Sequence, residues 1–464
     1  MARSREDVVI TGLSCRFADA PTPGAFWRNI VEGRTSFRPF DFISREESAR
    51  PIFDNYPPAF GAQLGSLYAF RPARAPLPEE LEPGENPDRP FALQLVCDAL
   101  RDAGLRPASL PTNRVSIRLG YAPPFNPASV NWLRRTVFLR EAMGVLQSCL
   151  PEVEPARLEE VRRALASHLP ATKAATLSSA TGGGIATWMA SQLRVRGPAT
   201  AVDAAFLSFY AALQQAMDDL LRHRVDIAVC GAIQPPFSRA RLEGLSGFLP
   251  FAPEGVLCPF CKETRGTLPG EGGAFFVLRR LNDAHRAESR VYAMVGGVGF
   301  AVGAPTRRGR TLPGAELSSA IEGALEQAEA TPESIRLIEA HGSGVARLDT
   351  TELTTVGSLL GLGCAARAKV GIGSVKGNIG HTLVASGAAG VLKAALAVYS
   401  RTLPPQVKVE KPHASFEAAD FPLYLLQETR PWIGGNARRT PRRALVESVD
   451  PSGSCACAIL EQER

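Results

Sequence analysis

The sequence lacks the long apolar segments that mark a membrane protein. No run of about 18 or more apolar residues occurs among its 464 residues, so we expect no membrane span. The first residues, MARSREDVVITGL, pass from a short polar lead directly into VVI, without the apolar core of a signal peptide. These two absences predict a cytoplasmic protein.

Regularly spaced cysteines are also absent. The nine cysteines are scattered, and an odd number without regular spacing argues against a disulfide framework. Two close pairs, Cys258–Cys261 and Cys455–Cys457, have spacings that resemble metal or redox sites. Zinc needs four convergent ligands, and the pairs lie far apart in the sequence. We therefore expect no metal site, and thiols that are buried or incidental.

The chain has only a small excess of charge of one sign, with a formal net charge of +6. Many of its arginines occur in dispersed pairs that lack interleaved aromatic residues, so we predict no nucleic-acid binding. The pairs either attract an acidic partner or are simply solvated surface. They are Arg134–Arg135, Arg162–Arg163, Arg307–Arg308, Arg438–Arg439 and Arg442–Arg443.

Strand-like and helix-like segments alternate along most of the chain. The strand-like runs are nearly continuous in apolar character, which suits a sheet covered on both faces. In the helix-like segments apolar residues recur every three or four positions. The predicted strands are 8–13, 115–121, 226–232, 273–281, 292–300, 335–342 and 369–374, and the predicted helices are 91–105, 209–224, 316–330 and 387–401. The pattern predicts an α/β architecture.

The chain reads as one large unit of two strand–helix halves. Two excursions interrupt the first half, an irregular one at 36–90 and an Arg-rich helical insertion at 122–172. The segment LPFAPEGVLCPF breaks the pattern near residue 250, so we expect the halves to be 1–250 and 251–464. The second half ends in a strand-like CACAIL.

Three polar residues lie where α/β proteins place their chemistry, at the carboxyl ends of strands. His341 follows an apolar strand in EAHGSG, and Lys376 and His381 lie in GSVKGNIGHT. A histidine at a strand end is often only structural. Here two of the chain's six histidines lie beside glycine turns, and a lysine lies close to one of them. This combination favours a functional site.

The segment AVDAAFLSFYAAL, residues 201–213, has the form of a strand-to-helix elbow. Enzymes often mount a nucleophile on such a turn. The residue at its tip is Phe206, which has no nucleophilic atom.

Taken in order, these motifs resemble the β-ketoacyl synthases, the condensing enzymes of fatty acid and polyketide assembly. The resemblance spans essentially the whole chain: VVITGLSCRFADAPTPGAFWRNIVEGR, LRVRGPATAVDAA, DIAVCGA, LPGEGGAFFVLRRL, EAHGSG, GSVKGNIGHT and GAAGVLKAALA follow in family order. The insertion is most similar to iterative synthases of polyunsaturated fatty acid and enediyne assembly. The resemblance implies a thiolase-like, five-layer αβαβα fold and no cofactor.

The resemblance also implies roles for individual residues. Phe206 occupies the position of the family's nucleophilic cysteine, and Leu207 and Phe209 replace small neighbours at a pocket or interface. His341, Lys376 and His381 match the remaining catalytic positions. Asp349 and Glu352 match the family's supporting acids. The family's glycine-rich loop is altered here to Ser448–Gly453, which ends at Gly453.

Ordinary condensation needs an acyl thioester on the elbow, which Phe206 cannot form. Ser208 is the nearest hydroxyl, but its side chain should point away from the elbow tip. Three hypotheses remain: a silent, chain-length-factor-like partner of an active ketosynthase, a malonyl-thioester decarboxylase that uses the two histidines, and a repurposed acyl-transfer or scaffold protein. The first predicts a heterodimer and the second an active homodimer. In each case the expected delivery partner is an acidic acyl carrier protein, which the arginines would attract.

Overall fold

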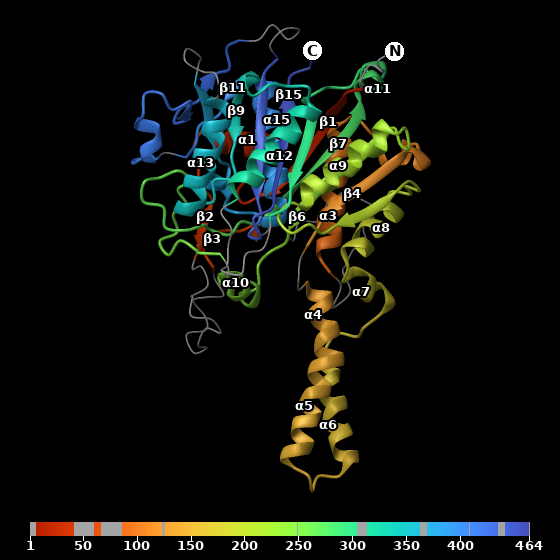
Figure 1. The fold of residues 1–464 in the computed structure, drawn as a ribbon. Helices are drawn as coiled ribbons and strands as arrows, with labels where there is room; N and C mark the ends of the chain where they lie inside the picture. Colours follow the sequence, from red (N-terminus) through yellow and green to blue (C-terminus); the bar gives the residue numbers. More distant parts are fainter. Residues whose placement is uncertain are drawn as a thin grey trace.

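The computed structural model describes residues 6–40, 60–65, 86–122, 126–247, 249–303, 313–361, 369–407, 409–434 and 441–463. Its central feature is a sheet with the strand order β12-β10-β9-β14-β15-β8-β1-β7-β6-β4-β5. The sheet consists of two half-sheets, which meet where Val8–Ile10 of β1 pairs with Ala293–Val295 of β8. Figure 1 shows the helices that cover it.

The elements have the following bounds. The strands are β1 Val8–Phe17, β2 Phe37–Pro39, β3 Phe60–Ala62, β4 Val115–Gly120, β5 Ala199–Val202, β6 Ile227–Gln234, β7 Gly272–Arg280, β8 Ala293–Ala301, β9 Ile335–Glu339, β10 Val370–Gly373, β11 Thr402–Leu403, β12 Leu423–Leu425, β13 Arg430–Pro431, β14 Arg443–Val449 and β15 Cys455–Glu461. The helices are α1 Pro23–Val31, α3 Asp88–Asp102, α4 Pro127–Leu133, α5 Leu139–Cys149, α6 Pro155–Ser167, α7 Ala174–Ser179, α8 Gly182–Gln192, α9 Ser208–Leu221, α10 Arg239–Ser246, α11 Leu281–Arg286, α12 Gly314–Gln327, α13 Ala346–Gly361, α14 Lys376–Ile379 and α15 Ser386–Ser400.

The helices and half-sheets form five layers. Helices α9 and α15 lie between the half-sheets and contact strands of both, such as β7 and β15. Helices α3 and α8 cover the outer face of the first half-sheet, and α12 and α13 cover that of the second. The three largest apolar clusters of the core are correspondingly one central and two outer ones. The predicted α/β, thiolase-like αβαβα fold is therefore confirmed.

The strand and helix predictions agree with the structure except at the ends of elements. Strand β7 bears on the expected division of the chain into halves. It lies after residue 250 but pairs with β1 and β6 of the first half-sheet. The first half-sheet thus extends beyond the expected division at residue 250. Most of the excursion at 36–90, together with Arg307–Arg308 and Arg438–Arg439, lies outside the described residues.

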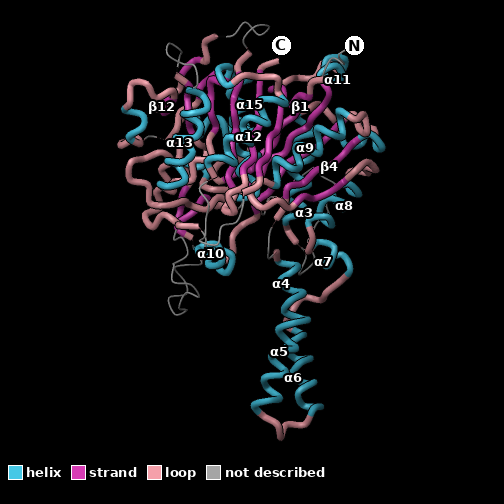
Figure 2. The backbone as a smooth tube through the Cα atoms, viewed as in Figure 1, coloured by secondary structure: helices cyan, strands magenta, loops and turns pink. Residues whose placement is uncertain are grey.

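The insertion at 122–172 forms a helical hairpin that projects from the body, seen in Figures 1 and 2 as α4, α5 and α6. A π-helical turn at Arg134–Phe138 joins α4 to α5. Helix α6 matches the predicted helix in EVEPARLEEVRRALASHL. Large apolar side chains remain exposed along the hairpin, with Phe138 61% and Val145 62% exposed.

Among the described residues, one apolar helical stretch is long enough to cross a membrane. Leu383–Ser400, which includes α15, meets this condition by length and composition, but 89% of it is buried inside the fold. Small residues allow this burial, since a Cβ on Gly387 would lie 2.5 Å from the ring of Tyr210 on α9. The segment is therefore a core helix of the central layer.

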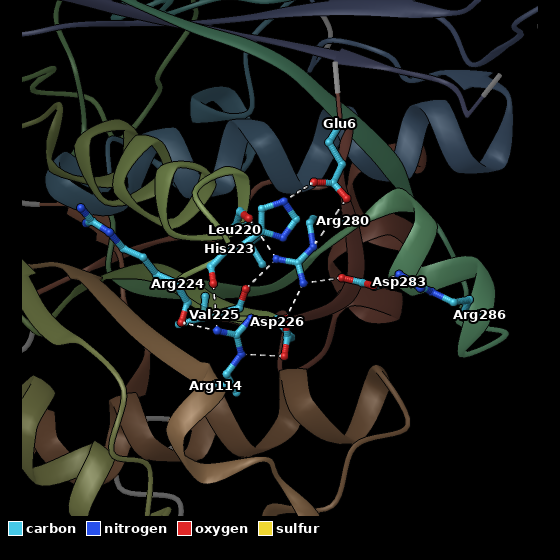
Figure 3. A network of polar contacts seen from close by, with 10 residues as sticks. All are labelled: Glu6, Arg114, Leu220, His223, Arg224, Val225, Asp226, Arg280, Asp283 and Arg286. Carbon is cyan, nitrogen blue, oxygen red and sulfur yellow. Dashed lines mark hydrogen bonds and ion pairs between the residues drawn. The ribbon is translucent and has the colours of Figure 1, made fainter. Parts of the chain in front are cut away.

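A polar network fixes the end of α9 that is remote from the elbow (Figure 3). The buried guanidinium of Arg280 donates hydrogen bonds to the carbonyls of Leu220 and Val225 at 2.9 and 2.7 Å. It also pairs with Asp226, which Arg114 contacts with two nitrogens at 2.9 and 2.8 Å. Hydrogen bonding from Arg114 lowers the pKa of Asp226 to about 2. These contacts attach α9 to β6 and β7.

The structure places the two cysteines of one close pair side by side. The Cα atoms of Cys258 and Cys261 are 5.7 Å apart within one short turn. Cys455 and Cys457, the second pair, are buried free thiols.

Candidate functional site

The strand-to-helix elbow forms as predicted between β5 and α9. Asp203 accepts a hydrogen bond from the N–H of Ala205, which has a left-handed φ of 47°. The hydroxyl of Ser208 accepts from the N–H of Ala204 and donates to the carbonyl of Ala205. Both hydrogen-bonding roles of Ser208 are used inside the turn, so its hydroxyl is not available as a substitute nucleophile.

Gly120 allows the elbow to approach the sheet. It ends β4, and a Cβ there would lie 2.9 Å from the backbone nitrogen of Phe209 and 3.0 Å from the carbonyl carbon of Ser208. No side chain fits without moving the first turn of α9. Leu207 and Phe209 are 6% and 0% exposed and lie in the central core cluster. They are thus buried within the chain, away from the cavity lining described next.

Phe206 lies at the tip of the elbow and is 8% exposed. Its ring packs in an apolar cluster with Leu249 and Leu383, among others, and its centroid lies 5.0 Å from that of His381 in an edge-on arrangement. It also lines a cavity of ≈ 40 Å³. That volume holds only ~3 water molecules. The lining includes Phe206, Leu249, His341, His381, Val449 and Asp450.

The two predicted histidines lie together in the lining of this cavity, beside Phe206. Their ring centroids are 5.3 Å apart, and both side chains are buried. Nδ1 of His341 accepts from the N–H of Val449 at 3.2 Å, and Nδ1 of His381 accepts from the N–H of Leu383 at 3.1 Å. A ring nitrogen that accepts from a backbone N–H carries no proton, so each neutral ring has its proton on Nε2.

Burial and the nearby Lys376 lower the pKa of both histidines well below the ordinary value. The two imidazoles are therefore neutral at physiological pH. Each presents an Nε2–H donor on the edge opposite its backbone contact, and both rings line the cavity. A pair of neutral donors of this kind suits the stabilisation of an enolate or carbonyl oxygen.

Lys376 lies behind the histidines and not in the cavity lining. Its ammonium group donates to the main-chain carbonyl of His341. Burial lowers the pKa of Lys376 to about 8. The lysine therefore acts on the position and electrostatics of His341 through the backbone.

The predicted supporting acids hold the loop after β9. Glu352 accepts from the backbone N–H groups of His341 and Gly342. Asp349 accepts from the hydroxyl of Ser343 at 3.0 Å and from the N–H of Gly344 at 3.2 Å. Burial raises the pKa of Asp349 to about 6 and that of Glu352 to about 7.

The sequence analysis missed a third buried carboxyl group. Glu447 on β14 is 2% exposed, and burial followed by the charge of Glu352 raises its pKa well above the ordinary value. Nearby, the ammonium of Lys393 lies 2.6 Å from a carboxylate oxygen of Glu339. The sequence did contain a signal for Glu447, because it is a charged residue inside the apolar run ALVESV. Its proximity to Glu352 could not be predicted from the sequence.

The sequence also did not indicate two hydrogen-bond partners of the His381 ring or the one that accepts from the N–H of the elbow. Ser386 lies 3.0 Å from Nδ1 of His381, next to the N–H of Leu383. The N–H of Phe206 donates to Oδ2 of Asp450 at 3.3 Å. Asp450 belongs to the altered loop that the sequence had singled out, in which Gly453 adopts a φ of 89° and closes the turn.

The Nε2–H groups of the two histidines are hydrogen-bond donors. The elbow has no nucleophile, whereas the histidine side retains two neutral donors. Within the described ranges, no group of three or more His, Cys, Asp or Glu residues could hold a metal ion. The two histidine donors suit the stabilisation of negative charge on an oxygen.

Comparison with protein families agrees with this arrangement. The family profile "Beta-ketoacyl synthase, N-terminal domain" matches residues 5–284, and "Beta-ketoacyl synthase, C-terminal domain" matches residues 292–410. The boundary between the two matches falls between β7, which belongs to the first half-sheet, and β8, which belongs to the second.

Known proteins with similar sequences include two large synthases. The chain is 29% identical to a phenolphthiocerol/phthiocerol polyketide synthase polypeptide of Mycobacterium tuberculosis, covering 98% of this chain and 23% of that protein. It is 26% identical to the mellein synthase of Phaeosphaeria nodorum, covering 98% of this chain and 24% of that protein. The chain thus spans about a quarter of these relatives.

Solved ketosynthase structures have the same fold. The ketosynthase from module 6 of the bacillaene synthase of Bacillus subtilis 168 matches with a TM-score of 0.79 at 23% identity, covering 99% of this chain and 72% of that one. An oxazolomycin ketosynthase domain of Streptomyces albus JA3453 matches with a TM-score of 0.79 at 22% identity, covering 99% and 74%. With both profiles matched in order over most of its length, the chain belongs to the β-ketoacyl synthase family.

Proposed function

We propose that this protein is a non-condensing ketosynthase-like subunit that partners an active ketosynthase in polyketide or fatty acid assembly. The single observation that carries the proposal is Phe206 at the elbow tip, whose ring centroid lies 5.0 Å from that of His381 and which lines a cavity of ≈ 40 Å³ together with both histidines. A phenyl ring can neither form a thioester nor leave room for an acyl chain.

The position of β5 supports a pairing role. It is an edge strand of the central sheet, half exposed, and it runs directly into the elbow. Edge strands with unpaired N–H and C=O groups are ready to pair with a second chain. A partner that extends the sheet here would bring its own elbow close to this one. The acyl group would then be carried on the partner, and an acyl carrier protein would deliver it.

A second candidate function is decarboxylation of a malonyl thioester. One observation favours it, namely that His341 and His381 both retain neutral Nε2–H donors toward the cavity. Such donors stabilise the enolate that forms when carbon dioxide leaves, and this step needs no cysteine. The small volume beside Phe206 weighs against it.

The test is carbon dioxide release from malonyl-loaded acyl carrier protein, followed by mass spectrometry of the carrier. Wild type is compared with His341→Ala and with His168→Ala, a matched control on the exposed hairpin. The proposal predicts that malonyl carrier stays unchanged with all three proteins.

Conversion to the acetyl form that is lost only in His341→Ala would overturn the proposal and establish the decarboxylase. In parallel, light scattering should detect a one-to-one complex with the cysteine-bearing ketosynthase of the same pathway. A chain that forms only homodimers in the presence of that ketosynthase would also contradict the proposed role.

A further inference from the structure

We infer that Asp450 is an internal ligand of the elbow, which occupies the position where an acyl oxygen would bind and so keeps the cavity closed to thioesters. The inference rests on the proposed function and deepens it, since it names the residue that complements Phe206 in silencing the site. It is carried by a contact between segments that are 244 residues apart.

The carboxylate of Asp450 is held at both oxygens. Oδ2 accepts from the N–H of Phe206 at 3.3 Å, and Oδ1 accepts from the N–H of Ser452 at 2.8 Å. Its backbone is fixed as well, because its N–H donates to the carbonyl of Ser454 at 2.8 Å and its carbonyl accepts from Gly453 at 2.8 Å. Asp450 is 9% exposed and lines the cavity with the two histidines.

Asp450 accepts the hydrogen bond of the Phe206 N–H, which is the donor that acyl chemistry at the elbow would need. This N–H lies just before the first turn of α9, where backbone N–H groups and the helix dipole favour negative charge. A thioester carbonyl attacked at the elbow tip develops an oxyanion, which requires preorganised donors. The carboxylate oxygen of Asp450 takes the place of that oxyanion.

The next residue of the loop offers no replacement donor. Pro451 follows Asp450 in the cavity lining, and proline has no backbone N–H. The other titratable groups that line the cavity are His341 and His381, which are neutral. Asp450 is therefore the only charged side chain among the described residues of the lining, and its charge opposes any second anion.

The test restores a thiol at the elbow and uses it as a probe. We compare Phe206→Cys, Phe206→Cys/Asp450→Asn and Phe206→Cys/Asp203→Asn by the pH dependence of alkylation with iodoacetamide. The thiolate attacks the reagent carbon and iodide leaves, so the rate follows the thiolate fraction. Asp203 is a matched control, because it is an exposed carboxylate in the same elbow.

If Asp450 faces the elbow as a carboxylate, Phe206→Cys alkylates slowly at neutral pH. Asp450→Asn then speeds the reaction about tenfold and shifts the midpoint of the pH profile down by about one unit. Asp203→Asn changes the rate by less than about twofold, since water screens its charge. Equal rates with and without Asp450 would overturn the inference.

A second measurement does not depend on the cysteine. In the Phe206 background, Asp450→Ala should speed hydrogen exchange of the elbow peptide by about tenfold, because the N–H of Phe206 loses its acceptor. Peptides from α12 should keep their rates. Unchanged exchange at the elbow would count against the inference. Neither result depends on whether wild type releases carbon dioxide, so failure of the proposed function would be recognised separately.

Discussion

The two walls of the cavity differ in what holds them. On the histidine wall, His341 and His381 receive backbone N–H groups at Nδ1, and buried carboxylates support the adjoining loop. On the elbow wall the turn is intact, but Phe206 stands at its tip and a carboxylate takes its N–H. The histidine wall carries two hydrogen-bond donors, while the elbow tip carries a phenyl ring.

The difference shows that the histidines are also structural parts of the fold. Nδ1 of His341 accepts the N–H of Val449 on another segment, and Nδ1 of His381 accepts the N–H of Leu383 two residues along the chain. Removal of either ring would leave a buried donor without its acceptor. At the elbow tip, Phe206 is held by its N–H bond to Asp450 and by apolar packing of its ring. The histidines thus have structural contacts of their own, whatever the chemistry at the elbow.

The largest effect is expected from Phe206→Ala, which removes the ring at the elbow tip. If the elbow wall is held by packing of the ring, the variant should lose about 3 kcal/mol of unfolding free energy, because a buried cavity replaces the phenyl group. Urea unfolding measures the loss. Phe138→Ala on the exposed hairpin is the control and should change stability by less than about 0.5 kcal/mol. A loss at Phe206 as small as at Phe138 would show that the ring does not support the wall.

The histidine wall is tested through Glu447→Gln. The raised pKa of Glu447 means that the folded protein keeps a proton which the unfolded chain releases above its ordinary value of 4.5. Wild type therefore loses stability as pH rises above that value, whereas glutamine does not titrate. From about pH 5 to pH 7.5, the stability of the variant relative to wild type should rise by about 2 to 3 kcal/mol.

Denaturant unfolding at several pH values measures this difference. Glu322→Gln on α12 replaces an exposed glutamate and should show no such slope. A pH-independent difference for Glu447→Gln would mean that Glu447 is ionised in the folded protein.

The smallest expected effect comes from Ser386→Ala, which removes the hydroxyl beside Nδ1 of His381. The N–H of Leu383 still bonds to the ring, so the loss should be about 1 kcal/mol, typical of one hydrogen bond. Thermal unfolding reports it, with Ser400→Ala at the exposed end of α15 as the control. A loss above about 3 kcal/mol would instead indicate that the serine alone orients the ring.

Much of this arrangement could be predicted from the sequence, because it depends on local pattern. Apolar periodicity located the strands and helices, and glycine turns after strands located His341 and His381. Contacts between distant segments could not be predicted in this way. The pairing of β7 with β1, the approach of Glu447 to Glu352 and the bond from Phe206 to Asp450 all arise from how the layers close.

The projecting hairpin has a consequence for how the protein moves in solution. A body with a long helical extension meets more friction than a compact body of equal mass, so it elutes early from a sizing column (Figure 1). A monomer of 49.6 kDa would therefore run toward the position of a dimer. Only light scattering or sedimentation equilibrium, which report mass independently of shape, can separate a lone chain from its pair.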